Sequence, residues 1–575
     1  MNKILPLLLL LLPALGFAQA VNAPLNRDYY HLVERYEIRQ GHFSPQLFTA
    51  MRPYSRKGIA LWADTLAQQE GWSKADRFNL EYLRNDNWEW IPESTEESKK
   101  PILKHFYRRP SDLYHVQEKN FNLHVNPVAS FGMGITNDRD ETLFASGRGV
   151  EIRGTIADAV GFYTFITDNQ VMLPQYVVGK PGAPKGNVPT IAKEGGLPGA
   201  GFWKNINDIE PGYEFFRARG HISINPIDEI SIQVGHDRQF IGHGYRSMAL
   251  SDFAPNYFFI RLNTQVWKFN YTNLFASVAP RALTDGEVFT DKYLAMHHLS
   301  LNITDNLNIG VFENITFSRG DSLQSQTFDP NYVNPIIFLR AAEHNRASLD
   351  NVILGADAKW IPFKGMQVYG QITFDDFKMK EFLGITSEGS YLNKYGIQAG
   401  FKYIDAFGVS NFDIQGEWNK VRPFTYSHNQ SNRRLSVNDA NYQHFGQPLA
   451  HPLGANFWEA LCSIRYQPFP RLQLHAMGVF AKMGEDPAGD ENWGGDIFKD
   501  YNDPIQQTGN DLLQGVEATL QYVDLTASYQ VKHNLFIDLK QVVRRLDSED
   551  DQRDIDTSYT TVTVRWNIPQ WRYEF

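Results

Sequence analysis

The sequence predicts an all-β transmembrane barrel of about 18 antiparallel strands with a small N-terminal α-helical domain. Three observations predict this fold. Apolar and polar residues alternate with a period of two from about residue 121 onward, no apolar run of 18 residues follows the N-terminal stretch, and short connections alternate with long ones. The mean hydropathy of −0.40 agrees with a barrel, because each strand shows lipid only one apolar face.

Residues 1–20 have the pattern of a secretory signal peptide. Lys3 precedes an apolar run, and Ala18 and Ala20 flank Gln19 in an A-x-A-like cleavage site. No cysteine follows that site, so we expect no lipid anchor. The single cysteine, Cys462, cannot form an internal disulfide.

Residues 21–118 are expected to form the helical domain. Ile59, Trp62 and Leu66 share one helix face, and Ser73 with Asp76 resembles a capping box that opens a further helix. Large barrel lumens are commonly filled, so this domain either plugs the barrel or packs against it. The sequence leaves both arrangements open.

Residues 119–575 are expected to form the barrel. Between residues 366 and 375, Met366, Val368 and Ile372 share one face and Gln367, Gln371 and Asp375 the other. A soluble sandwich also alternates, but four expected loops of roughly 30 to 45 residues favour a barrel. Glu313 falls on an apolar face, and a bulge at Phe312 would turn it inward.

The predicted strands number about 18, an even count that puts both termini in the periplasm and the long loops outside the cell. The barrel is expected to close at residues 558–568, with Trp571, Tyr573 and Phe575 in a tail beyond Pro569. The predicted strands are 121–132, 142–156, 160–168, 213–224, 229–235, 257–264, 267–278, 293–303, 307–317, 348–361, 366–376, 394–404, 409–421, 456–467, 472–483, 517–530, 534–544 and 558–568.

Charge and motifs argue against several functions. The net charge of −10 gives no basic footprint for nucleic acid. Asp321 and Ser322 resemble an esterase nucleophile block but open a loop instead of a strand-to-helix elbow, so we expect no catalytic residue and no enzyme. The acidic loop 484–503 lacks the spacing of a recognised calcium loop. A metal site is the less favoured interpretation of a histidine group, because adjacent histidines on a strand face opposite ways and His297 and His298 cannot bind one ion together, so we expect no metal and no cofactor. That group comprises His236, His243, His297 and His298, with Asp237.

Aromatic and planar polar side chains in the long loops could bind sugars, since ring faces stack on pyranoses and polar groups bond their hydroxyls. Packing of the loops on themselves is the alternative interpretation. Both signs of charge occur on the inward faces, which favours a filled lumen over an ion-selective pore. The candidate ligand-binding residues are Trp203, Tyr245, Arg246, Tyr257, Tyr426, Tyr442 and Trp493.

Several sequence blocks resemble the Wzi-like outer-membrane proteins of capsule assembly, including their RemB-type relatives in gliding motility. The blocks are residues 235–238 (GHDR), 242–246 (GHGYR), 250–252 (LSD), 293–300 (YLAMHHLS) and 369–377 (YGQITFDDF). This resemblance implies an 18-stranded barrel, a helical bundle at its periplasmic side, and a role without catalysis in organising surface polysaccharide or supporting gliding.

The expected partners are outer-membrane lipid, the barrel-assembly machinery and surface polysaccharide, with surface adhesin or motility components as a further possibility. A porin for sugars or other nutrients is the alternative function, because 16 to 18 strands can enclose a channel. The expected location is the outer membrane.

Overall fold

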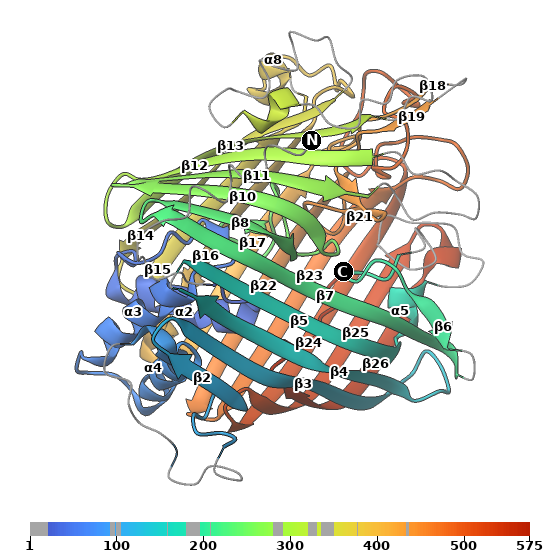
Figure 1. Ribbon diagram of the computed structural model, residues 1–575. Helices are drawn as coiled ribbons and strands as arrows, with labels where there is room; N and C mark the ends of the chain where they lie inside the picture. The colour runs from blue at the N-terminus through green and yellow to red at the C-terminus, as the bar shows by residue number, and fades with distance from the viewer. Residues whose placement is uncertain are drawn as a thin grey trace, which may run out of the picture.

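A computed structural model describes residues 21–91, 98, 105–157, 159–179, 196–206, 209–279, 291–319, 330–334, 350–376, 378–432 and 436–575. The predicted signal peptide and the block around Asp321 and Ser322 lie outside these residues. The chain forms a closed antiparallel barrel with helices at one end and long connections at the other (Figure 1). We call these the short-turn end and the long-loop end.

Eighteen strands close the barrel in the described part of the chain, and each overlaps one predicted strand, so the predicted fold is confirmed. β26 pairs with β3 to close it, from Trp566 opposite Ala129 to Tyr559 opposite Thr136. The strands are β3 (Phe121–Thr136), β4 (Leu143–Ile156), β5 (Val160–Met172), β7 (Ile209–Ile227), β8 (Ile230–Asp237), β10 (Tyr257–Val266), β11 (Phe269–Val278), β12 (Asp291–Asn302), β13 (Leu307–Arg319), β14 (Asn351–Phe363), β15 (Met366–Phe374), β16 (Tyr395–Tyr403), β17 (Phe412–Val421), β22 (Phe457–Phe469), β23 (Leu472–Glu485), β24 (Val516–Lys532), β25 (Leu535–Ser548) and β26 (Ile555–Trp566).

Shorter elements extend the sheet or lie in the connections. β2 pairs with β3, so sheet pairing begins at Tyr114, and β6 pairs with β7. These elements are β1 (Met51–Arg52), β2 (Tyr114–Glu118), α5 (Gln175–Val178), β6 (Lys204–Ile206), β9 (Phe240–Ile241), η2 (Pro330–Val333), α8 (Met379–Phe382), η3 (Ala406–Gly408), β18 (Asn429–Asn432), β19 (Ser436–Asp439), β20 (Gln443–His444), β21 (Gln447–Pro448) and η4 (Asp551–Arg553).

The outer face of the barrel is apolar and the inner face is polar. On β26, Val562 and Val564 are exposed, whereas Arg565 points inward and binds Asp538. Rows of exposed large apolar side chains are costly in water but suit a lipid surface. No helix among the described residues is long and apolar enough to cross a membrane.

Glu313 corrects one prediction. The pairings of β13 with β12 and with β14 are continuous, so the expected bulge at Phe312 is absent from the described strands. Asn314 points into the lumen and donates to Tyr442 Oη, which leaves Glu313 on the outer face. There it lies 3.1 Å from Nδ1 of His297 on β12. Contact with His297, rather than a bulge, accommodates the carboxylate of Glu313 on the outer face.

The helical domain contains α2 (Arg27–Gln40), α3 (Arg56–Ala67), α4 (Lys74–Asp86) and η1 (Trp88–Trp90). The predicted capping box is confirmed, since Ser73 and Asp76 exchange hydrogen bonds at the start of α4. Ile59, Trp62 and Leu66 are buried on one face of α3, as predicted. With Tyr36 of α2 they belong to a core separate from the main core of the barrel.

Candidate functional site inside the barrel

Helix α2 attaches the helical domain to the inner wall through buried ion pairs. Arg35 lies 2.7 Å from Asp76 of α4 and 2.8 Å from Asp413 of β17, and it also contacts Asp405. Two lysines of the wall form equivalent pairs: Lys359 with Glu37 at 2.9 Å and Lys402 with Glu34 at 2.5 Å. Buried ion pairs between α2 and the barrel strands therefore hold the helical domain at the short-turn end.

The carboxylates of Glu34 and Asp76 are held ionised. Burial alone would raise the pKa of Glu34, but Arg52 and Lys402 outweigh it and lower that pKa below its usual range. The pKa of Asp76 is also lowered, because Arg35 and hydrogen bonds from Ser73 and Arg39 overcome the effect of burial. The helical domain is therefore docked by charge.

The connection of residues 238–256 folds into the lumen. Its strand β9 pairs with β1 of the helical domain, Ile241 opposite Met51. The backbone N–H groups of Tyr245 and Arg246 donate to the carboxylate of Glu417 on β17, at 2.6 and 3.1 Å. A Cβ at Gly244 would lie 2.6 Å from that carboxylate, so the close approach requires glycine. The Gly-His-Gly block thus shapes an inward loop.

Two histidines of this region contact one carboxylate of the wall. Nε2 of His243 lies 3.1 Å from Asp357, and Nε2 of His298 lies 2.8 Å from the other oxygen of the same carboxylate. His297 points outward to Glu313, and His236 is exposed. Of the four histidines noted in the sequence, His243 and His298 therefore meet at one carboxylate, and the other two lie elsewhere.

A second connection, residues 422–456, packs on the first. Tyr426 Oη donates to the carbonyl of Met248 at 2.8 Å, and Tyr442 Oη donates to that of Ala249 at 2.7 Å. Their rings stack with centroids 5.9 Å apart. Ser251 N–H donates to the carbonyl of Leu449 at 2.7 Å. These contacts fill the lumen toward the long-loop end.

The C-terminal tail also returns into the lumen. β26 overlaps the predicted closing strand 558–568 but ends two residues earlier, at Trp566, and residues 567–575 turn inward. Phe575 is 2% exposed, and its terminal carbonyl accepts from Nε of Arg544 at 2.8 Å. Glu574 accepts from Tyr245 Oη and lies 3.2 Å from Arg27. The tail thus ties the wall, the inward loop and the helical domain together.

The seven candidate ligand-binding residues fall into two groups. Tyr245, Arg246, Tyr257, Tyr426 and Tyr442 are buried inside the barrel, and their polar groups bond protein atoms. Trp203 and Trp493 are half-buried in long connections, so a sugar ring could reach part of each. A ligand-binding role for the seven remains a prediction.

Three side chains that bind the inward loop were not predicted as site residues from the sequence: Glu417, Gln371 and Glu574. Gln371 accepts from the backbone N–H of Met248 at 2.6 Å. Each of the three is an inward strand residue or a tail residue whose partner lies more than 120 positions away. No local sequence signal marks such pairs.

The packed lumen leaves small cavities between the described residues. Those found range from about 40 Å³, beside His31 and Arg465, to about 310 Å³, between the helical domain and β8, β10 and β11. Polar side chains line both. The barrel is thus largely filled by its own chain.

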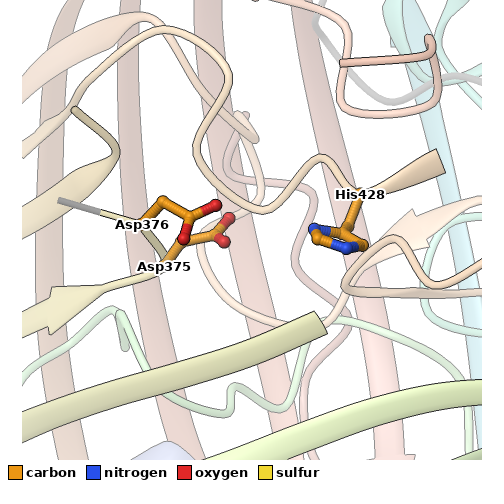
Figure 2. A group of neighbouring side chains, drawn as sticks. All are labelled: Asp375, Asp376 and His428. Atoms are coloured by element: carbon orange, nitrogen blue, oxygen red, sulfur yellow. The ribbon is translucent and has the colours of Figure 1, made fainter. Parts of the chain in front are cut away.

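Asp375, Asp376 and His428 form a group whose potential metal-ligand atoms lie within 4.8 Å of one another (Figure 2). The buried amine of Lys394 lies 3.2 Å from Asp375 and 3.3 Å from Asp376, and it neutralises part of their charge. Burial raises the pKa of Asp375 to about 6, although Lys394 opposes this. The ammonium group of Lys394, rather than a metal ion, accounts for the close approach of the two carboxylates.

The fold and the apolar outer face define an outer-membrane-type β-barrel whose lumen is occupied by its own chain. Among solved structures, the chain is similar to Wzi of Escherichia coli, an outer membrane protein involved in group 1 capsule assembly and described as a carbohydrate-binding β-barrel. The TM-score is 0.52 at 11% identity, over 96% of this chain and 100% of Wzi. At this identity the likeness establishes the fold.

Two barrels of Pseudomonas aeruginosa are also similar. OccK8 (OprE) has a TM-score of 0.40 at 9% identity, over 77% of this chain and 97% of its own. OprD has a TM-score of 0.39 at 11% identity, over 77% and 94%. No protein-family profile and no curated protein sequence matches the chain.

Proposed function

We propose that this protein is a non-enzymatic outer-membrane barrel that binds or organises surface polysaccharide, as in capsule attachment, or that supports surface gliding. The observation that carries the proposal is the structural likeness to the carbohydrate-binding barrel Wzi over 96% of the chain. The sequence blocks that resemble Wzi-like proteins, GHGYR among them, support it independently. RemB-type relatives remain a prediction from those blocks alone.

In this proposal the short-turn end and the helical domain face the periplasm, and the long connections face outward. The alternation of short and long connections and the even strand count support this orientation. The partners would be outer-membrane lipid, the barrel-assembly machinery and surface polysaccharide, with adhesin or motility components on the gliding branch.

A nutrient porin is the second candidate, because an 18-stranded barrel is wide enough to enclose a channel. The inward loops, the tail and the helical domain occupy that space, which favours the first proposal. Planar-bilayer recordings of the purified protein separate the two. A steady large conductance would favour the porin.

The proposed function is tested in cells by deleting the gene and measuring surface polysaccharide retention and surface movement. We expect one of the two to be lost and to return with the wild-type gene. Unchanged retention together with unchanged movement would refute the proposal.

A glycan array on the purified full-length protein tests the binding step. We expect Trp203→Ala and Trp493→Ala to weaken binding, because only these two of the seven candidates are half-exposed. Trp267→Ala is the matched control, since Trp267 is 76% exposed but lies at a short turn. An equal effect of all three would contradict a binding face at the long-loop end.

A further inference from the structure

A cavity of about 130 Å³ lies beside the C-terminal tail inside the barrel. Arg217 of β7, Arg238 and the tail residues Trp571 and Tyr573 line it, and Gly199 of the connection between β5 and β7 reaches it from the long-loop end. At about 30 Å³ per water this space holds about four water molecules, and a cavity of about 150 Å³ can admit a ring the size of benzene.

Five arginines and three carboxylates, those of Asp28, Asp252 and Glu574, line this cavity. Three of its five arginines have carboxylate partners: Arg27 binds Asp252 at 2.9 Å, Arg572 binds Asp28 at 2.7 Å and Arg246 binds Glu459 at 2.9 Å. The other two, Arg217 and Arg238, have no carboxylate within 4.0 Å in the described part of the chain. Both side chains are half-buried. A cation partly shielded from water without a counter-charge is costly, so a site of this kind favours an anion.

The contacts of the two arginines leave hydrogen-bond donors available. The Arg217 guanidinium lies 5.5 Å from the ring centre of Phe215 and 5.9 Å from that of Trp571. Arg238 donates through Nη1 to the carbonyl of Asp252 at 2.7 Å, while its buried Nε has no hydrogen-bond partner among the described residues. Burial lowers the pKa of Arg238, and Asp252 and Asp237 do not restore it.

The C-terminal tail places two aromatic rings beside these arginines in the cavity. Trp571 and Tyr573 are half-buried, and the buried Nε1 of Trp571 has no hydrogen-bond partner in the described structure. Guanidinium groups bind carboxylates through paired N–H bonds, and indole faces stack on the apolar faces of sugar rings. The combination of donors and ring matches an anionic saccharide better than an inorganic ion.

We infer that this cavity binds the carboxylate of an acidic sugar residue, with Arg217 and Arg238 on the carboxylate and Trp571 along the sugar ring. The inference rests on the proposed function and names the class of glycan that the protein would take. A bound carboxylate would supply the counter-charge that the described chain does not place beside these two arginines.

The test is calorimetric titration of the full-length protein in detergent with trigalacturonate, its methyl ester and the neutral maltotriose. We expect the ester and maltotriose to bind at least tenfold more weakly than trigalacturonate. Arg217→Met and Arg238→Gln should each weaken trigalacturonate binding at least tenfold. Arg261→Gln is the matched control: Arg261 is a buried lumen arginine that has no ion pair with any described residue, but it lines the cavity of about 310 Å³.

Folding is monitored through the unfolding temperature of each variant, and Arg238→Lys covers the case in which Arg238→Gln does not fold. Lysine keeps the charge but loses the paired geometry, so binding should still weaken. Equal binding of acid and ester, no binding of trigalacturonate, or full binding by the folded variants would overturn the inference. Binding of inorganic phosphate as tight as that of trigalacturonate would overturn the assignment to a sugar.

Failure of the inference and failure of the proposed function give different results. Equal binding of neutral and acidic glycans, unaffected by Arg217→Met, overturns the inference and supports the proposed function. Trigalacturonate binding that depends on both arginines, in cells whose polysaccharide retention and movement do not need the protein, supports the inference and refutes the proposed function.

Discussion

The helical domain at the short-turn end and the inward loop of residues 238–256 both dock on the inner wall of the barrel, but the wall holds them with different chemistry. The helical domain docks through charges, such as Arg35 with Asp413 and Lys402 with Glu34. The loop docks mainly through backbone groups, such as Met248 N–H to Gln371 and the N–H of Tyr245 to Glu417. The difference follows from what each segment brings into the lumen.

A helix satisfies its own backbone, so only its side chains remain to contact the wall. A loop buried without regular pairing has free N–H and carbonyl groups, and each must find a partner. The wall accordingly supplies Gln371, Gln398 and Glu417 at the level of the loop, and Gln398 donates to the carbonyl of Arg246 at 3.0 Å. Conditions that weaken charge pairs should therefore act mainly on the helical domain.

The largest effect is expected from Arg35→Met. The substitution removes the shared cation and leaves Asp76 and Asp413, which are buried, without it. Breaking a buried pair costs about 3–5 kcal/mol, so we expect the free energy of unfolding to fall by about that amount. Urea titration of the protein in detergent measures the change, and limited proteolysis shows whether residues 27–90 are released first.

Arg39→Met is the matched control for that substitution. Arg39 also contacts Asp76, but its side chain is 25% exposed, so water can replace the lost partner. Equal losses in the two variants would contradict the view that burial makes the α2 pairs decisive.

Acid should act with opposite sign on the helical domain and on the second inward connection, residues 422–456. Because the folded-state pKa values of Glu34 and Asp76 are lowered, the stability they contribute is present above about pH 5 and is lost as pH falls. The pKa of Asp375, at the end of β15, is raised to about 6, so its contribution is largest in acid and falls as pH rises through about 6. We expect acid to loosen the helical domain first.

Hydrogen exchange by mass spectrometry at pH 7 and pH 3, corrected for intrinsic rates, measures this. Residues 27–90 should lose protection at pH 3, while residues 422–432 should keep it. Glu34→Gln should reduce the pH dependence of the helical domain, because that position no longer titrates. Equal loss of protection in both regions would contradict the comparison.

Tyr442→Phe is expected to have a moderate effect. It removes the hydrogen bond to the carbonyl of Ala249 and leaves that buried group unpaired, which costs about 1–2 kcal/mol. The effect should not depend on salt, since no net charge is involved. Tyr466→Phe is the control: its ring lies on the outer face against Phe412, and we expect a change within about 0.5 kcal/mol. Urea titrations at two salt concentrations measure both.

The strands could be predicted from the sequence because each one meets lipid on one face and a polar lumen on the other. This contrast imposes the period of two locally, as in β15, where Val368 faces out and Gln371 faces in. The capping box of α4 is equally local. Neither prediction needed information about distant parts of the chain.

The lumen could not be predicted in the same way. Tyr426 and Tyr442 were candidates for outer loops, but their hydroxyl groups bond carbonyls 178 and 193 positions away in the chain. The residues beyond Pro569 were predicted to form a tail after the last strand, yet nothing in their sequence indicates that Phe575 would reach Arg544. Such contacts depend on the closed barrel bringing both partners together.

The smallest effect is expected from Asp376→Asn. Its side chain is 37% exposed and shares Lys394 with Asp375, so the loss should be at most about 1 kcal/mol. Asp375→Asn is the matched variant and should cost more, because the buried Asp375 also accepts from the backbone N–H of Tyr426 at 2.7 Å. Unfolding temperatures of both variants, with and without calcium or magnesium, measure this. Because Lys394 already occupies the space between the two carboxylates and neutralises part of their charge, added cations should not stabilise the wild type, and a clear stabilisation would identify the group in Figure 2 as a metal site instead.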